Sequence, residues 1–165
     1  MTTTLHPEYE RKWLLQRLPE VSFQRCLHIR QGYIEQNQVW VRIRETVFPD
    51  TSVQCVLCRK IPITGGNMEW EVPISRDAFE MLWFLCTGSS LVKTRYEFLD
   101  GAGFRWEIDV FEGDLDGFVI MELELPDPNT KVIIPDVLAA CIEREVTGDP
   151  TWSNRMLARR LHAHS

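Results

Sequence analysis

The sequence has few of the features that mark membrane or secreted proteins. Its uninterrupted apolar runs are only a few residues long, whereas a bilayer-spanning helix needs about 20 apolar residues. The N-terminal residues lack the basic start and the apolar stretch of a secretory signal. We therefore expect a soluble, cytoplasmic protein without a membrane partner.

The chain also lacks a disulfide framework. Five cysteines in a chain without a secretory signal predict reduced thiols rather than disulfides. Cys55 and Cys58 form a lone C-x-x-C motif, but a zinc site would need a second ligand pair, and none has the required spacing. We expect the cysteines to be buried structural residues.

Positive charge is in deficit, with 18 Lys and Arg against 24 Asp and Glu and a formal net charge of −6. Because nucleic-acid-binding proteins usually present a basic surface, this composition argues against a nucleic-acid partner. A small anionic substrate is not excluded, since the total charge does not say where the charges lie. With 165 residues, 44% of them hydrophobic, and no repeat or linker, the chain is predicted to form one domain over residues 1–165.

Short segments rich in β-branched and aromatic residues alternate with turn signals such as Asp100-Gly101. This pattern predicts a mostly antiparallel sheet of eight strands, over residues 8–15, 28–35, 38–45, 53–61, 67–74, 90–99, 103–112 and 118–125. Apolar stripes at helical spacing predict three helices, over residues 76–86, 135–145 and 153–162. Ser75 and Ser153 are the expected N-caps of two of them, and Pro135 is expected in the first turn of the other.

Charged residues alternate with apolar residues in most of the predicted strands, as in Val39-Trp40-Val41-Arg42-Ile43-Arg44 and Met121-Glu122-Leu123-Glu124-Leu125. Residues two apart in a strand share a face, so one face of each strand is ionic and the other is apolar. An antiparallel sheet with one solvated face explains this pattern. A closed eight-stranded barrel with an ionic interior explains it too, and such a barrel can hold one small ligand. Outward aromatic residues such as Trp70 and Trp106 would then need cover from the helices.

The residues on these ionic faces carry both signs of charge. The acids are Glu8, Glu10, Glu69, Glu71, Glu107, Asp109, Glu122 and Glu124. The bases are Lys12, Arg42, Arg44, Lys60, Lys93 and Arg95. So many carboxylates in one interior need interleaved cations or bound metal, and hard oxygen ligands favour Mg²⁺ or Mn²⁺. Arginine and lysine suit phosphate oxygens, so the combination indicates phosphoryl-transfer chemistry.

The order of these motifs resembles that of the CYTH family, also called triphosphate tunnel metalloenzymes. The segment Glu8-Tyr9-Glu10-Arg11-Lys12 matches the family's E-x-E-x-K signature. Further matches follow in the family's order, in Gln31-Gly32-Tyr33, Arg42-Ile43-Arg44, Glu69-Trp70-Glu71, Lys93-Thr94-Arg95-Tyr96, Trp106-Glu107-Ile108-Asp109, Glu122-Leu123-Glu124-Leu125, Glu145-Val146-Thr147-Gly148-Asp149 and Ser153-Asn154. The resemblance implies an α+β fold: a closed, eight-stranded antiparallel tunnel barrel with flanking helices and a C-terminal helix.

The resemblance also implies an activity, the metal-dependent hydrolysis of the terminal phosphate of inorganic triphosphate inside the tunnel. The metal, Mg²⁺ or Mn²⁺, would be bound by Glu8, Glu10, Asp109, Glu122 and Glu124. The substrate would be bound by Lys12, Arg42, Arg44, Lys60, Lys93 and Arg95, although periodicity alone does not choose between Lys60 and its neighbour Arg59. Lys12, Lys93 and Glu10 are the expected catalytic residues, with Lys93 as the helper that activates water.

The sequence leaves other readings open. A class IV-type adenylate cyclase, or a triphosphatase for nucleoside or thiamine triphosphates, would use the same tunnel. A non-catalytic module that binds polyphosphate or nucleotide would keep the cations but would not hydrolyse its ligand.

Asn67 stands where the family often has an arginine, so one phosphate contact is absent or moved to Arg59. The histidines, including His6, are expected to be tail residues rather than ligands, and the Arg155–Arg160 cluster is expected to be the polar face of a terminal helix. Whether the chain forms a homodimer stays open.

Overall fold

The computed structural model, which describes residues 3–160, contains eight strands that form a closed ring. Each strand of the ring is antiparallel to both of its neighbours, in the order β5-β4-β3-β2-β6-β7-β8-β1, and pairing between β1 and β5 closes it. The strands are β1 (Thr4–Leu15), β2 (Arg25–Gln36), β3 (Val39–Val47), β4 (Val53–Ile63), β5 (Gly66–Ile74), β6 (Ser90–Leu99), β7 (Arg105–Phe111) and β8 (Val119–Leu125). The predicted closed antiparallel barrel is therefore confirmed.

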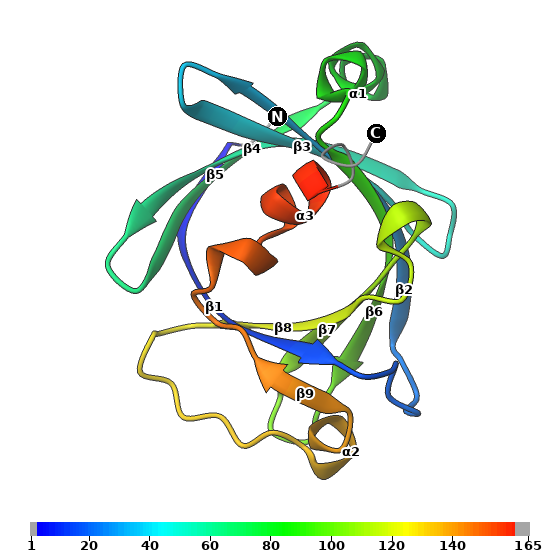
Figure 1. Cartoon of the computed structure of the whole chain (residues 1–165), viewed down its shortest axis with the longest axis vertical. Coiled ribbons are helices and arrows are strands. Elements are labelled where there is room, and N and C mark those ends of the chain that lie inside the picture. Colours follow the sequence, from blue (N-terminus) through cyan, green and yellow to red (C-terminus); the bar gives the residue numbers. More distant parts are fainter. Residues whose placement is uncertain (1–2, 161–165) are drawn as a thin grey trace.

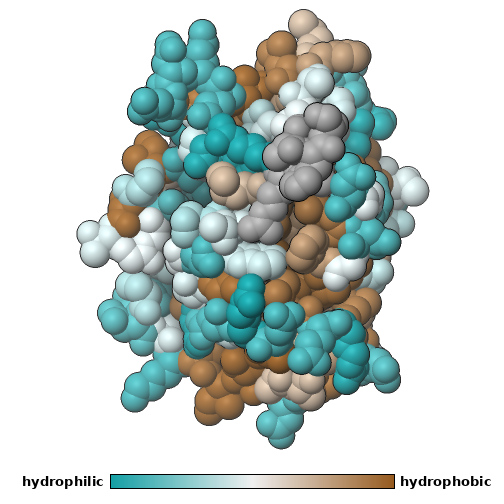
Figure 2. Space-filling view, in the orientation of Figure 1, coloured by the Kyte–Doolittle hydropathy of each residue, from teal (hydrophilic) through white to brown (hydrophobic). Residues whose placement is uncertain are grey.

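Short helices and one further strand surround the ring. They are α1 (Arg76–Trp83), η1 (Phe84–Cys86), η2 (Gly113–Leu115), α2 (Asp136–Ala139), β9 (Ile142–Glu145), η3 (Pro150–Trp152) and α3 (Asn154–Arg160). Figure 1 looks along the barrel: α1 lies outside the ring on one side, α2 and β9 lie outside on the opposite side, and η3 and α3 lie within its outline. From the same direction, Figure 2 shows both hydrophilic and hydrophobic residues on this end of the molecule. None of the described helices has the length and apolar character needed to span a bilayer.

Strand periodicity sorts the side chains into outward and inward faces. In β6 the inward positions Lys93, Arg95 and Glu97 are buried, and the residues between them face outward. The outward side of β1, β7 and β8 forms an apolar cluster around Trp13 and Trp106, covered by the segment that contains Leu138 and Cys141. Trp106 is completely buried in this cluster, to which α2 contributes Leu138, whereas Trp70 on β5 remains 45% exposed.

The C-terminal segment closes one end of the barrel. Leu157 and Ala158 of α3 are fully buried against Leu14, Leu91 and Phe111, which occupy the ends of β1, β6 and β7 nearest to this helix. These residues form an apolar layer at the end of an otherwise ionic interior. The predicted helix over residues 153–162 is confirmed over Asn154–Arg160, and its last two residues lie outside the described part of the chain.

The structure contradicts one predicted helix, over residues 135–145. Only Asp136–Ala139 is helical, and Ile142–Glu145 forms β9 on an edge of β1 that β5 does not cover. Tertiary pairing with Trp13, Leu14 and Leu15 therefore prevails over the helical apolar spacing. Pro135 precedes the first helical residue instead of occupying the first turn. The other N-caps are confirmed, because the Ser75 hydroxyl accepts from the Ala78 amide and the Ser153 hydroxyl accepts from the Met156 amide.

Candidate active site

A cavity of about 520 Å³ occupies the interior of the barrel. Acids and bases line it in equal number. The lining acids are Glu8, Glu10, Glu69, Glu71, Glu107, Glu122 and Glu124, and the lining bases are Lys12, Arg42, Arg44, Lys60, Lys93, Arg95 and Arg155. The sequence assigned eleven residues to metal or substrate. Ten of them line this one cavity, and Asp109 does not. Of the two neighbours between which periodicity did not choose, Lys60 lines the cavity and Arg59 does not.

Lys12 from β1 connects carboxylates on two strands. Its ammonium nitrogen lies 2.9 Å from Glu122 Oε1 on β8 and 3.3 Å from Glu10 Oε1 on its own strand. Burial lowers the pKa of Lys12, but the charges of Glu122 and Glu10 outweigh that effect and raise it above its usual value. Lys12 is therefore a fixed positive charge between two of the expected metal ligands.

Arg95 and Lys93 from β6 share the carboxylate of Asp109. Arg95 donates from Nε and Nη2 to the two Asp109 oxygens at 2.7 Å each, and Lys93 Nζ lies 2.5 Å from Asp109 Oδ2. Arg95 also pairs with Glu122 at 3.0 Å and with Glu107. Asp109 is fully buried and does not line the cavity, so this geometry favours a role in positioning two cations over the expected role in binding metal.

Burial and neighbouring charges set the protonation of the cavity carboxylates in opposite directions. Burial raises the pKa of Glu8 to about 7, although its ion pair with Lys60 opposes the shift. Burial and the charge of Glu107 raise the pKa of Glu124. Burial also acts to raise the pKa of Glu122, but Lys12, Lys93 and Arg95 together hold it well below its usual range. Glu8 and Glu124 are thus carboxylates whose negative charge lacks full compensation, which is a condition that a bound cation would relieve.

Arg42 and Arg44 from β3 face Glu69 and Glu71 from β5. Arg42 Nη2 lies 2.6 Å from Glu69 Oε1, and one nitrogen of each arginine lies 3.3 Å from Glu71 Oε1. Arg42 Nε is buried without a hydrogen-bond partner in the structure. A buried guanidinium with an unused N–H is prepared to donate to a further anion, since leaving the donor unpaired is costly.

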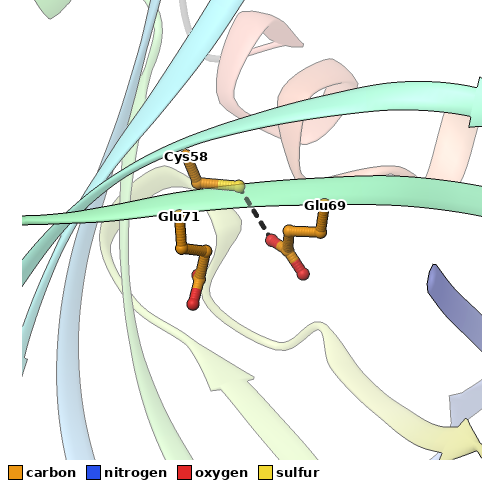
Figure 3. A group of neighbouring side chains, drawn as sticks. All are labelled: Cys58, Glu69 and Glu71. Carbon is orange, nitrogen blue, oxygen red and sulfur yellow. Dashed lines mark hydrogen bonds between the residues drawn. The ribbon is translucent and has the colours of Figure 1, made fainter. Parts of the chain in front are cut away.

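Cys58 extends this group, and its thiol donates to Glu69 Oε1 at 2.8 Å (Figure 3). Figure 3 shows the three side chains of Cys58, Glu69 and Glu71 close together, and their ligand atoms lie within 4.8 Å of one another. Burial raises the pKa of the thiol to about 12, so it stays protonated, and both carboxylates are already paired with arginines. The group therefore balances the arginines and is a poor site for a metal ion. The expectation of buried cysteines holds for Cys55, Cys58, Cys86 and Cys141, but it is wrong for Cys26, which is exposed.

Sequence reasoning missed several residues of the cavity wall. His6 lies on β1 in the cavity wall, 3.9 Å from Glu69 Oε2, so the expectation of a tail residue is wrong. Its position two residues before Glu8, on the same strand face, was the signal that could have identified it. Arg155 also lines the cavity, and its guanidinium lies over the Trp40 ring, 5.1 Å from the centroid. The sequence placed Arg155 only on the polar face of a terminal helix, and helical periodicity does not show that this face meets the mouth of the barrel.

The fold and the paired charges inside it define a tunnel barrel of the CYTH type. The chain is 37% identical to the inorganic triphosphatase of Acetivibrio thermocellus over 153 residues, which cover 92% of this chain and 93% of the relative. It is 29% identical to the inorganic triphosphatase of Nitrosomonas europaea, covering 92% and 96% of the two chains. No family model matches the chain. On these likenesses, the chain belongs to the inorganic triphosphatase family.

Solved structures agree on the fold. The crystal structure of the inorganic triphosphatase NE1496 is 28% identical and superposes with a TM-score of 0.61, covering 92% of this chain and 94% of that one. A protein from Pyrococcus horikoshii OT3 shares the fold at 19% identity, with a TM-score of 0.59 and coverage of 95% and 100%. The closed barrel of this chain is thus the barrel of its relatives.

Proposed function

We propose that this protein hydrolyses the terminal phosphate of inorganic triphosphate in the barrel cavity, with Mg²⁺ or Mn²⁺ as cofactor. The observation that carries the proposal is the convergence of ten expected ligand residues on one cavity inside the barrel. The sequence match to the two inorganic triphosphatases extends over almost their whole length, which supports the same substrate here.

The donor set of the cavity fits a hard divalent cation. Glu8, Glu10, Glu122 and Glu124 offer carboxylate oxygens from two neighbouring strands, and Glu10 lies opposite Glu124 in the pairing of β1 with β8. Because lining acids and bases are equal in number, the cavity has no excess of positive charge to neutralise a triphosphate. These carboxylates would hold a divalent cation, which would supply positive charge and Lewis acidity to the terminal phosphoryl group.

The cations of the cavity bind and orient the substrate in this proposal. Arg42, Arg44 and Arg95 offer planar forks that match phosphate oxygens, and Lys12 and Lys60 offer point charges. Each of these residues is now held by a carboxylate, so their side chains are ordered before substrate arrives. Phosphate oxygens replace part of these ion pairs, and the unused Nε of Arg42 gains an acceptor.

The hydrolytic step needs a water molecule in line with the terminal phosphorus. The water oxygen forms a bond to phosphorus, the bridging P–O bond breaks, and orthophosphate and pyrophosphate result. In its neutral form, Lys93 is the proposed acceptor of the water proton. Burial and the charge of Arg95 favour that form by lowering the pKa of Lys93, and Asp109 fixes its position. Lys12 and Glu10 complete the proposed catalytic set at the β1 side of the cavity.

Release of orthophosphate from tripolyphosphate tests this proposal. We expect release in the presence of Mg²⁺ or Mn²⁺, and a loss of about a hundredfold or more in Glu10→Ala. The matched control is Glu20→Ala, since the Glu20 side chain is 94% exposed and lies outside the cavity. Equal release by Glu10→Ala and the wild type, or no release with either metal, would refute the proposal. Parallel reactions with ATP, followed for cyclic AMP and for orthophosphate, define the substrate range.

A further inference from the structure

A second cavity, of about 320 Å³, lies at the end of the barrel opposite α3. It is lined by Gln24, Arg25, Glu97, Leu99 and Arg105, which we call the arginine mouth. These residues lie at the start of β2, the end of β6 and the start of β7. The other ends of the same three strands carry Tyr33, Leu91 and Phe111, which pack against α3. The arginine mouth is therefore far along the barrel from the C-terminal segment.

One buried carboxylate organises the arginine mouth. Glu97 Oε2 accepts from Arg25 Nε and from Arg105 Nη1, at 2.7 Å each, and the Glu97 side chain is only 5% exposed. The arginine side chains are 43% and 52% exposed, so each guanidinium is held at one nitrogen and open to solvent at the others. Two positive charges against one negative charge leave this cavity with a net positive charge in a protein of net charge −6.

The arginine mouth has more hydrogen-bond donors than acceptors. Both Nη groups of Arg25, and Nε and Nη2 of Arg105, have no acceptor among the described residues. Gln24 accepts from the Leu99 amide at 2.6 Å through Oε1, which leaves the N–H groups of its amide without an acceptor in the same part of the chain. Preordered guanidinium N–H groups converging on one cavity are the donors that recognise a phosphate oxyanion.

The arginine mouth lies next to the ionic interior along β6, although the two cavities share no lining residue. Glu97 follows Lys93 and Arg95 on the inward face of β6, and two residues along a strand advance by about 6.6 Å. Glu97, which holds the two arginines of the mouth, is therefore the next inward position after Arg95.

We propose that the arginine mouth is a second oxyanion site, which binds inorganic phosphate at the barrel end opposite α3. That its ligand in the cell is a phosphate rests on the proposed function, because orthophosphate is the product of that reaction. The site itself rests only on the donors and charges described above.

Two opposite substitutions test the site by NMR titration of metal-free protein with inorganic phosphate. The reporters are the Gln24 side-chain amide and the Leu99 backbone amide, which lie in the arginine mouth, and the Gln31 side-chain amide, which lies in the main cavity. We expect saturable shifts of Gln24 and Leu99 in the wild type. Arg105→Gln should weaken this binding about tenfold, and Glu97→Gln should strengthen it about threefold or more, because one removes a charge-assisted donor and the other removes the competing acceptor.

The control is Arg17→Gln, an exposed arginine outside both cavities, which should leave the titration unchanged. Weaker binding in both Glu97→Gln and Arg105→Gln would show that the three residues form only a structural ion pair, and unshifted Gln24 signals would show that no site exists. Either result overturns the proposal. Turnover of tripolyphosphate without a Gln24 response removes this site alone, whereas a Gln24 response without turnover removes the proposed function alone.

A second titration, with a linear polyphosphate longer than three units, distinguishes two ligands of the arginine mouth: the end of a polyphosphate chain and free orthophosphate. The end of a long chain shifts Gln24 and Gln31 at the same concentration, because one molecule then occupies both cavities. Free orthophosphate shifts Gln24 independently of Gln31.

Discussion

At the scale of single residues, Asp109 illustrates how a carboxylate acts by holding cations in place. It has no exposed surface, and its two oxygens accept from Arg95 and Lys93. A buried charge that loses its partner is strongly destabilising, because the remaining charge has neither water nor a counterion. The positions of Arg95 and Lys93 in the cavity therefore depend on Asp109.

Asp109→Asn should lower the free energy of unfolding of the metal-free protein by about 3 to 5 kcal/mol, as measured by urea denaturation. Asp114→Asn, an exposed aspartate in η2, is the matched control and should change it by less than about 0.5 kcal/mol. If Asp109 served chiefly to bind metal, its removal would relieve repulsion among carboxylates. Unchanged or increased stability of Asp109→Asn without metal would therefore contradict the positioning role.

Strand parity alone predicted most of the cavity residues, because inward positions follow a period of two in every barrel strand. The partner of each residue could not be predicted in this way. Asp109 and Glu107 share an inward face and the same chemistry, but only Glu107 lines the cavity. Asp109 lies directly opposite Arg95 in the pairing of β6 with β7, and both of its oxygens accept from the Arg95 guanidinium. This contact depends on the register of two strands, which strand parity does not give.

At the scale of elements, β1 is the strand on which the site depends most. It carries His6, Glu8, Glu10 and Lys12 on one face, and it pairs with β5 up to Glu8 and with β8 from Tyr9 onward. The seam with β5 runs close to Gly66, where a Cβ atom would overlap the carbonyl oxygen of Glu8. The absence of a side chain at Gly66 thus permits the backbone approach that closes the ring.

Gly66→Ala should open this seam and lower the free energy of unfolding by about 1 to 3 kcal/mol, because neither backbone can yield without breaking strand pairing. It should also reduce tripolyphosphate hydrolysis, since Glu8 lies at the point of overlap. Gly101→Ala is the control, because a Cβ atom there meets nothing within 4 Å. Thermal and urea unfolding of both variants measure the effect, and equal stability of the two would argue against a tight seam.

The strands were predicted to within a few residues, and the segment over residues 135–145 was not. Val137, Leu138, Cys141 and Ile142 have helical spacing, so the local pattern gave no reason to end the helix at Ala139. The deciding factor is the free edge of β1, which accepts β9 from more than a hundred residues away in the chain. Long-range pairing of this kind is not encoded in local periodicity.

At the scale of the whole molecule, the interior charges make stability depend on pH in two opposite ways. Burial acts to raise the pKa of Glu69, but Arg42 and Lys60 hold it at about 2, whereas burial raises the pKa of Glu8 to about 7. The usual glutamate pKa is 4.5. As the pH falls from 4.5 toward 2, Glu69 becomes protonated in the unfolded chain but stays ionised in the folded protein, and stability falls. As the pH rises from 4.5 toward 7, the unfolded chain releases a proton that Glu8 retains, and stability falls again.

Glu8→Gln should therefore remove the decline between pH 4.5 and 7 in the metal-free protein, a difference on the order of 3 kcal/mol at pH 7. Urea denaturation at a series of pH values measures it, with the exposed Glu20→Gln as the control. Parallel curves for Glu8→Gln and the wild type would mean that Glu8 ionises normally in the folded protein.

The ring of hydrogen-bonded strands also bears on self-association. Each strand from β1 to β8 has a neighbour on both sides, so the folded barrel offers little unpaired backbone as a template for cross-β growth. The outer edge of β9 is only four residues long, and three of them, Glu143, Arg144 and Glu145, are charged. Aggregation of this protein should therefore require two neighbouring strands of the ring to separate first, and conditions that keep the ring closed should also keep concentrated solutions clear.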